Sequence, residues 1–300
     1  MREPFDLDPV AARHDLVAPM ARAGLSEPQA AADLQADPFG PLLRAAALST
    51  LTSASSPESA PSARARLLRR VARSAASSRV HHTQRHADTR AIQAAPGVTT
   101  RCLYRADARQ AHRPGEPETV TLVELAPGAT WSGPAADLQR EWLVLRGQVE
   151  FGSTALLEHD YHVVPAGIEA GALLARRGAL LYQRQSPREA AAAQQVSTQR
   201  AAGAEWADFG PGIKRRVLWQ QAAQAAMRYL ALPGAAVPHH GHRHDEECLM
   251  LGGDLFLDEV LLRTLDYQIA PAGTEHASVL TDTGVLLFAH GDLELDLKAA

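Results

Sequence analysis

The hydrophobic and polar positions divide the chain into two parts of different character. Residues 1–90 are rich in Ala, Arg, Ser and Pro and contain almost no Val, Ile or Tyr, a composition that favours helices over strands. Short helices are expected over 9–23 and 28–50, because prolines interrupt the pattern between them. A basic amphipathic helix is expected within 53–76, after a Ser/Pro-rich start. Its apolar face would consist of Leu67, Leu68, Val71 and Ala75, with arginines on the other faces.

From about residue 95 the pattern changes to alternating runs of Val, Leu and Tyr, separated by Gly and Pro-Gly turns. Such alternation is typical of an all-β sandwich or barrel. This half also contains an internal repeat, in which three separated segments recur after the same 106 positions. A constant offset is hard to obtain by chance. The matching segments are LAPGA and ALPGA (from 125 and 231), EWLVLRG and ECLMLGG (from 141 and 247), and DYHVVPAG and DYQIAPAG (from 160 and 266).

We therefore predict a mainly β chain with two tandem barrels after a short helical region. The expected divisions are a helical region and linker at 1–90, a first barrel at 91–190 and a second barrel at 206–300. The segment between the barrels is expected to be a helix or loop that packs on them.

A histidine-rich run, PHHGHRHDEECLML from residue 238, lies in the second repeat. His240 and His242 occupy alternate strand positions and therefore point to the same face. Glu246 can join them from the next strand, and His276 lies at a tight turn into a later one. Three imidazoles and one carboxylate suit Zn, Fe, Mn, Ni or Cu and leave one or two coordination positions open, without choosing among these metals. Within the run, His239 is expected to be solvated, as is His244.

The first repeat lacks this set of ligands. When the four positions are carried back by 106 residues, none of the corresponding side chains can bind a metal. His159 and His162 lie nearby but have no partners in register. We therefore expect one divalent metal ion per chain, in the second barrel. The four corresponding residues are Pro134, Ala136, Arg140 and Ala170.

Composition restricts the class of protein. A net charge of -4 gives no whole-chain case for nucleic-acid binding, and no run approaches the roughly 18 apolar residues of a membrane span. The two cysteines, Cys102 and Cys248, are too far apart and too few for a disulfide scaffold, so a reducing cytoplasm is expected. Cys248 is expected to be a small buried apolar residue, and the alternative is a redox-sensitive neighbour of the metal.

The motifs around these ligands resemble the cupin superfamily. Gly234-x5-His240-x-His242-x3-Glu246-x6-Gly253 fits the first cupin motif, and Pro271-x-Gly273-x2-His276 fits the core of the second. The second motif usually opens with Gly where this chain has Leu265, and often ends with Asn where it has Leu280. The segments EECLMLGGDLFLDE, DYQIAPAGTEH and PGIKRRVLW resemble the cupin domain of ChrR-type anti-sigma factors. This resemblance implies a bicupin with a degenerate first barrel and a metal ion, commonly zinc, at His240, His242, Glu246 and His276.

ChrR-like proteins join such a cupin domain to a helical anti-sigma domain that holds its own zinc through His and Cys residues. His14 is present here, but the first 101 residues contain no Cys, so that zinc motif is incomplete. The order of helices followed by a cupin domain nevertheless makes a sigma factor, bound through residues 1–76, the expected partner. A homodimer also stays open.

Two functional hypotheses follow, because this fold hosts both binding proteins and enzymes. The first is a zinc-binding bicupin regulator or sensor, which resembles ChrR-type anti-sigma factors and binds a small molecule at the second barrel. The alternative is a metal-dependent cupin dioxygenase or other oxidoreductase that acts on a small organic substrate. Fe, Mn and Ni suit the same ligands, and no catalytic residue is assigned.

Overall fold

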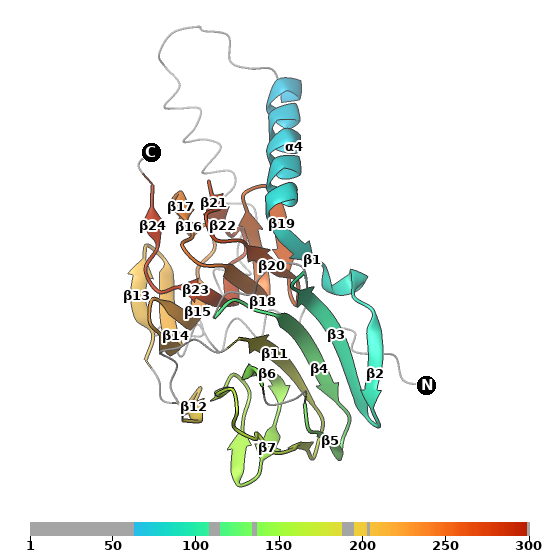
Figure 1. Ribbon diagram of the computed structural model, residues 1–300. Helices are drawn as coiled ribbons and strands as arrows, with labels where there is room; N and C mark the ends of the chain where they lie inside the picture. The colour runs from blue at the N-terminus through green and yellow to red at the C-terminus, as the bar shows by residue number, and fades with distance from the viewer. Residues whose placement is uncertain (1–62, 108–114, 134–136, 188–194, 203–204, 299–300) are drawn as a thin grey trace, which may run out of the picture.

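The computed structural model describes residues 63–107, 115–133, 137–187, 195–202 and 205–298. The helices expected over 9–23 and 28–50 lie outside these ranges. Helix α4 (Ala63–Val80) confirms the predicted basic amphipathic helix, and a short 3-10 helix η1 (His86–Asp88) follows it. In Figure 1, α4 rises away from the second barrel. Among the described residues, no helix is both long enough and apolar enough to span a membrane.

The rest of the described chain is mainly strand, as predicted. The first barrel combines a large sheet of seven strands with a small sheet of four. The large sheet has the order β12 (Ser197–Gln199), β9 (Tyr161–Val164), β6 (Gln139–Gly147), β11 (Ala179–Ser186), β4 (Thr119–Leu125), β3 (Val98–Arg105) and β2 (Ala91–Ala95). The small sheet has the order β5 (Ala129–Trp131), β10 (Leu173–Ala175), β7 (Val149–Phe151) and β8 (Thr154–Leu156).

The second barrel repeats this plan. Its large sheet has the order β1 (His82–Gln84), β20 (Tyr267–Ala270), β18 (Glu246–Leu257), β23 (Val285–Asp292), β15 (Gln224–Ala231), β14 (Ile213–Gln221) and β13 (Ala207–Gly210). The strands β16 (Ala236–Val237), β22 (Val279–Leu280) and β19 (Val260–Arg263) extend it through β18. A separate small sheet contains β21 (Glu275–His276), β17 (His240–Gly241) and β24 (Asp296–Leu297).

The repeat predicted from the sequence also appears in the strand register. Leu143 on β6 lies opposite Tyr182 on β11, and 106 positions later Leu249 on β18 lies opposite Phe288 on β23. Both strand pairs then contain a register shift at the same place in the repeat. Since register is set by residue positions along each strand, the two barrels are copies of one plan down to single residue pairs.

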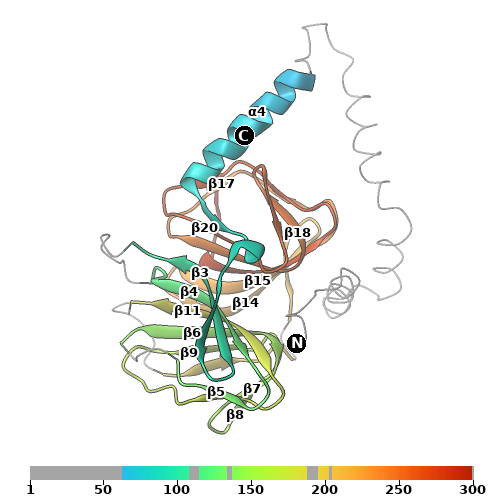
Figure 2. The ribbon, with the colours of Figure 1, turned by 90° about the vertical axis from the view of Figure 1, so that its right-hand side faces the viewer.

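Each large sheet has one face inside its own barrel and the other face against the partner sheet. On β6, Trp142 and Val144 belong to the core of the first barrel, whereas Leu143 joins a central core between the barrels. Leu249 and Phe288 reach the same central core from the second barrel. Figure 2 shows the strands of the two large sheets stacked between the barrels. The two repeats are therefore packed together through an apolar layer that neither could bury alone.

The two repeats exchange a short strand. β1 precedes the first barrel in sequence but pairs with β20 of the second, and β12 precedes the second barrel but pairs with β9 of the first. Equivalent ion pairs hold both segments: Arg85 contacts Asp266 at 2.9 Å, and Arg200 contacts Asp160 at 2.9 Å. The segment between the barrels, expected to be a helix or loop, thus contributes a strand to the first barrel. The domain divisions at 91–190 and 206–300 stay predictions.

Candidate metal centre

The four predicted ligands meet at one end of the second barrel. His240 lies on β17, directly opposite His276 on β21 in the strand register. His242 follows β17 by one residue, and Glu246 is the first residue of β18. The short antiparallel pair therefore aligns two of the histidines, and the turn into β18 returns the carboxylate to them.

The side chains of the four predicted ligands lie close to one another. Glu246 Oε2 lies 3.6 Å from His242 Nδ1 and 3.9 Å from His276 Nε2. The ring of His240 lies 5.2 Å from that of His242 and 5.7 Å from that of His276, measured between centroids. Ligand atoms bound to one ion at about 2.1 Å each stand roughly 3 to 4 Å apart. One possible ligand atom from each of His240, His242 and Glu246 lies within 4.8 Å of the other two. His276 lies beside this group, with its Nε2 3.9 Å from Glu246 Oε2.

Neighbouring groups orient two of the imidazoles. His240 Nδ1 lies 2.8 Å from the carbonyl oxygen of Pro238, and His276 Nδ1 lies 3.2 Å from Asp258 Oδ2. A histidine whose Nδ1–H donates to such an oxygen presents Nε2 as the lone-pair ligand. The histidines of the group are 1 to 5 % exposed, so these bonds fix their rings within the protein.

The third imidazole, that of His242, has a nitrogen that the protein leaves unsatisfied. His242 Nε2 is buried and has no hydrogen-bond partner among the described residues. Burial, above all, lowers the pKa of His242 against the opposing effect of Glu246, so the ring is neutral at pH 7. Both nitrogens of the buried His290 also have no hydrogen-bond partner within the described ranges, but His242 stands within a group of possible metal ligands. A neutral imidazole is the form that binds metal ions.

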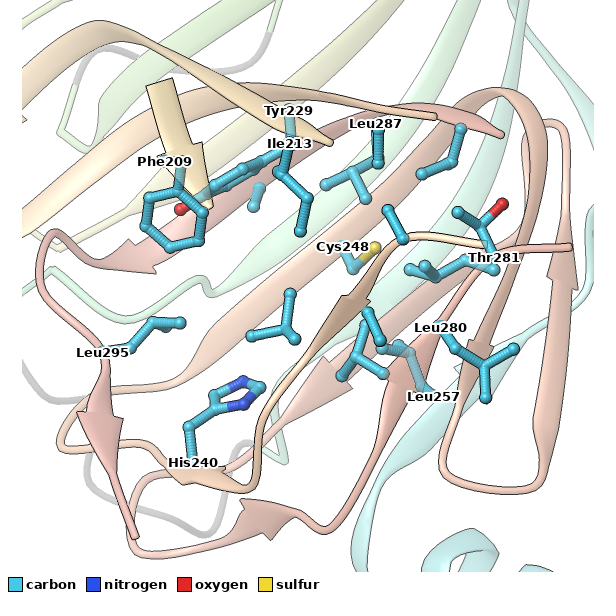
Figure 3. A pocket seen from close by; sticks show the side chains of 18 of the residues that line it. Phe209, Ile213, Tyr229, His240, Cys248, Leu257, Leu280, Thr281, Leu287 and Leu295 are labelled. Carbon is cyan, nitrogen blue, oxygen red and sulfur yellow. The ribbon is translucent and has the colours of Figure 1, made fainter. Parts of the chain in front are cut away.

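An apolar cavity of about 80 Å³ adjoins the group. Figure 3 shows His240 and Cys248 facing this space together with leucine and aromatic side chains. Glu246 also lines it, with Tyr229 and Thr281 as further polar groups. Burial and the nearby Glu246 raise the pKa of both Cys248 and Tyr229, so both stay protonated at neutral pH. The cavity therefore suits a small, largely apolar molecule.

The other residues of the histidine-rich run have separate partners. His239 contacts Glu275 at 3.1 Å, and the partly exposed His244 contacts Asp292 at 2.6 Å. Glu247 is buried between the barrels, where it accepts hydrogen bonds from Tyr182 and Tyr267 and pairs with Arg184. These residues lie outside the group of His240, His242 and Glu246. Cys248 is buried and free, and Cys102 is exposed and free.

The corresponding region of the first barrel has different chemistry. Arg140, at the position of Glu246, is buried and donates to the carbonyl oxygen of Ile168. Ala170, at the position of His276, packs against the apolar core, and Pro134 and Ala136 lie outside the described residues. His162 bonds to Thr198 Oγ1 at 2.8 Å. In the described part of this barrel, no group of potential metal ligands comes together.

Two further residues lie beside the centre, Asp258 and His81. The sequence gives no sign of Asp258, and it favours a solvated linker for the histidine cluster at 80–86 that contains His81. That interpretation is wrong for His81, which is buried. Asp258 lies at the turn between β18 and β19, and the ring of His81 lies 4.6 Å from that of His276. Burial alone would raise the pKa of Asp258, but hydrogen bonds from His276 and from the backbone of Ser278 and Ala277 lower it to about 2. Asp258 stands within the motif DLFLDE, but only the fold places its carboxylate behind His276.

The comparisons with known proteins support this architecture. Residues 194–294 match the family model of the ChrR cupin-like domain. A search of curated protein sequences found no match to the chain.

Solved structures share the fold at low sequence identity. A bacterial pirin from Escherichia coli in complex with nickel(II) is 12% identical, with a TM-score of 0.54 over 70% of this chain and 98% of its own. Oxalate decarboxylase of Bacillus subtilis, studied for its Mn(II) centres, is 12% identical with a TM-score of 0.51, over 73% and 78%. A candidate dioxygenase from Nostoc punctiforme is 16% identical with a TM-score of 0.54, over 68% and 78%.

These likenesses establish the fold of both barrels, since each extends over about two thirds of this chain or more. The family match covers the second repeat, which contains the four predicted ligands. Residues 194–294 are therefore similar to the ChrR cupin-like domain, in a chain whose overall fold is that of the cupins.

Proposed function

We propose that the second barrel binds one divalent metal ion through His240, His242, Glu246 and His276. The observation that carries this proposal is the buried Nε2 of His242, which has no hydrogen-bond partner in the described structure and belongs to a group of converging ligands. Zinc is the proposed ion, on the family resemblance, and Fe, Mn and Ni suit the same donors. Similar folds are known with nickel(II) and Mn(II).

In this proposal the chain is a regulatory protein, and it uses the metal centre to sense a small molecule or oxidant. The apolar cavity beside His240 and Glu246 is where a small ligand would meet the ion. Among its lining residues, the groups that are not proposed ligands are apolar or protonated, which favours binding over proton-transfer chemistry. Helix α4 would carry the response to a sigma factor bound through residues 1–76. Its Leu67, Leu68 and Val71 are 61%, 56% and 57% exposed, so an apolar surface is available to a partner.

A cupin dioxygenase or other metal-dependent oxidoreductase is the second candidate. The same cavity favours it, because an open coordination position beside an apolar space can receive a small organic substrate. In that case the ion would supply the redox chemistry when bound. The protein residues would orient the substrate and exclude water.

Metal analysis tests the centre itself. Purified full-length protein should contain about one tightly bound metal ion per chain, and His242→Ala should lower that content at least tenfold. His244→Ala is the matched control, because its half-exposed side chain bonds to Asp292 instead. Full metal content in His242→Ala would contradict the proposed ligands.

Co-purification separates the two functions. The sigma factor encoded beside the gene should form a complex with this chain, and Leu68→Glu combined with Val71→Glu should abolish it while the metal content stays unchanged. Failure with every neighbouring sigma factor would overturn the regulatory proposal. Oxygen uptake by iron-loaded protein with diketone substrates, lost in His242→Ala, would instead support the oxidoreductase.

A further inference from the structure

A second group of potential metal ligands lies directly behind His276. One ligand atom from each of His81, Asp258 and His276 lies within 4.8 Å of the other two. His81 is 5 % exposed and His276 is 1 % exposed. Two imidazoles and one carboxylate are ligands that divalent transition metals commonly take. We propose that His81, Asp258 and Nδ1 of His276 form a second binding position for a divalent transition-metal ion. This proposal rests on the first centre, because His276 contributes to both.

Asp258 presents one carboxylate oxygen to this position. Its Oδ1 accepts hydrogen bonds from the backbone N–H groups of Ala277, at 2.7 Å, and Ser278, at 3.1 Å. Its Oδ2 lies 3.2 Å from His276 Nδ1. The backbone amides thus hold the ionised carboxylate in place through one oxygen, and the other faces the two imidazoles.

The backbone at Asp258 points to a use for this side chain. Asp258 has a φ of 55°, in the left-handed region that favours glycine, and the equivalent residue of the first barrel is Gly152 with a φ of 56°. Aspartate tolerates this region better than most residues but still at some cost. Where glycine would suit the turn, the second barrel keeps a carboxylate, and such local strain is characteristic of functional sites.

His81 reaches this position through the strand exchange. It lies between the end of α4 and strand β1, which pairs with β20 of the second barrel. The ion pair between Arg85 and Asp266 anchors the same segment. The second repeat therefore supplies two of the three ligands, and the segment that precedes the first repeat supplies the third.

The first barrel has lost all three ligands of this group. In the exchanged segments the offset between the repeats is 115 positions, as from Arg85 to Arg200, so His81 corresponds to Val196. Asp258 and His276 correspond to Gly152 and Ala170. The two groups of ligands are thus present together in one barrel and absent together from the described part of the other.

The second ion should bind more weakly than the first. Two divalent ions on the two nitrogens of one imidazole repel each other. When Nδ1 of His276 forms its bond to the second ion, its N–H bond breaks and the proton passes to solvent, which leaves a bridging imidazolate. The simpler alternative is that Asp258 only orients His276 for the first ion, in which case His81 would not affect the number of ions bound.

Zinc titration of the metal-free full-length protein tests the proposal. The wild type should bind two equivalents in two steps, the second at least tenfold weaker and accompanied by release of an additional proton. His81→Ala should lose the second step and keep the first. His82→Ala is the matched control, since its exposed neighbouring imidazole should leave both steps unchanged. His81→Gln provides a second variant of closer size if His81→Ala does not fold.

Copper(II) provides an independent readout. Two copper ions that share one imidazolate should give a magnetically coupled electron paramagnetic resonance signal, and His81→Gln should give only the signal of an isolated ion. Saturation of the wild type at one equivalent, or a second step that persists in both His81 variants, would overturn this proposal. Two intact steps in His242→Ala would instead overturn the first centre, so the two failures can be told apart.

Discussion

The two barrels share one backbone plan but differ in what fills their interiors. At one interior position the first barrel has Trp142 where the second has Cys248, and at another it has Gln183 where the second has Ala289. Trp142 is fully buried against Phe151 and donates to Gln183 Oε1 at 3.0 Å. The large side chains occupy in the first barrel the space that the second leaves as a cavity.

This difference shows how one fold can separate structure from chemistry. The second barrel carries buried imidazoles, a carboxylate and an open cavity, all of which reduce the apolar packing that stabilises a barrel. The first barrel has no metal ligands at the equivalent positions, fills its interior with the ring of Trp142, and contributes a full face to the central core. The barrel without ligands would thus stabilise the barrel that has them.

The barrels also share a buried ionic cluster. Arg184 lies between Glu141 of the first barrel, at 2.8 Å, and Glu247 of the second, at 2.6 Å. Burial alone would raise the pKa of Glu141, but Arg184 and then His290 hold it below its ordinary value. The two glutamates are equivalent positions of the repeat, whereas Arg184 is matched by His290. The single guanidinium of Arg184 therefore pairs with the buried glutamates of both repeats.

The largest expected effect comes from removing that cation. Arg184→Met would leave Glu141 and Glu247 buried without a positive partner, and the free energy of unfolding should fall by about 3 to 5 kcal/mol. Urea denaturation measures this change, and a single transition is expected because the barrels share their central core. The triple variant with Glu141→Gln and Glu247→Gln should recover most of the loss. Two separate transitions in the wild type would contradict a shared core.

The sequence predicted the barrels and the four converging residues because their information is local. Alternation, Gly turns and a constant offset identify strands and their order, and motif spacing identifies ligands that lie on adjacent strands. Leu265 stands where the second cupin motif usually has glycine. Its φ is 67°, in the left-handed region that favours glycine, and the equivalent His159 of the first barrel has a φ of 68°. Both barrels thus form this turn without glycine, so the departure from the motif leaves the fold unchanged.

The strand exchange could not be read from hydrophobic periodicity. His82–Gln84 and Ser197–Gln199 are short and polar, so they carry no apolar alternation. A trace was present in the triplet Thr-Gln-Arg, which occurs at 83–85 and again at 198–200. The two triplets are 115 positions apart, whereas the main repeat has an offset of 106. The offsets differ because the segment between each triplet and the barrel sequence that follows it has a different length in the two copies. The position of His81 beside His276 depends on this exchange, so the sequence favoured a solvated linker there.

The second prediction tests whether packing alone distinguishes the two interiors. Trp142→Cys places the side chain of the second barrel into the first and removes a large buried ring. The cavity left behind should lower the free energy of unfolding by about 3 to 4 kcal/mol. The metal content should stay the same, because no ligand is gained. Denaturation and elemental analysis measure both quantities, and a loss below about 1 kcal/mol would show that the first barrel does not depend on this ring.

The smallest effect concerns the response of the two barrels to acid, at an equivalent pair of residues. His162 of the first barrel bonds to Thr198 Oγ1, and Gln268 of the second bonds to Thr83 Oγ1 at the same 2.8 Å. Burial, with a smaller contribution from Arg200, lowers the pKa of His162 from 6.5 to about 4. Because the folded pKa lies below the unfolded one, the unfolded chain takes up this proton first. Stability is then complete above pH 6.5 and is lost as pH falls toward 4.

His162→Gln should remove this sensitivity, since the amide can keep the bond to Thr198 and does not titrate. Between pH 7.5 and 5, the wild type should lose about 2 kcal/mol more unfolding free energy than the variant, as the linkage relation gives for this shift. Denaturation at both values of pH measures the difference, in which titrations common to both proteins cancel. An equal loss in the two proteins would mean that folding does not shift the pKa of His162, and the two barrels would then not differ in their response to acid at this position.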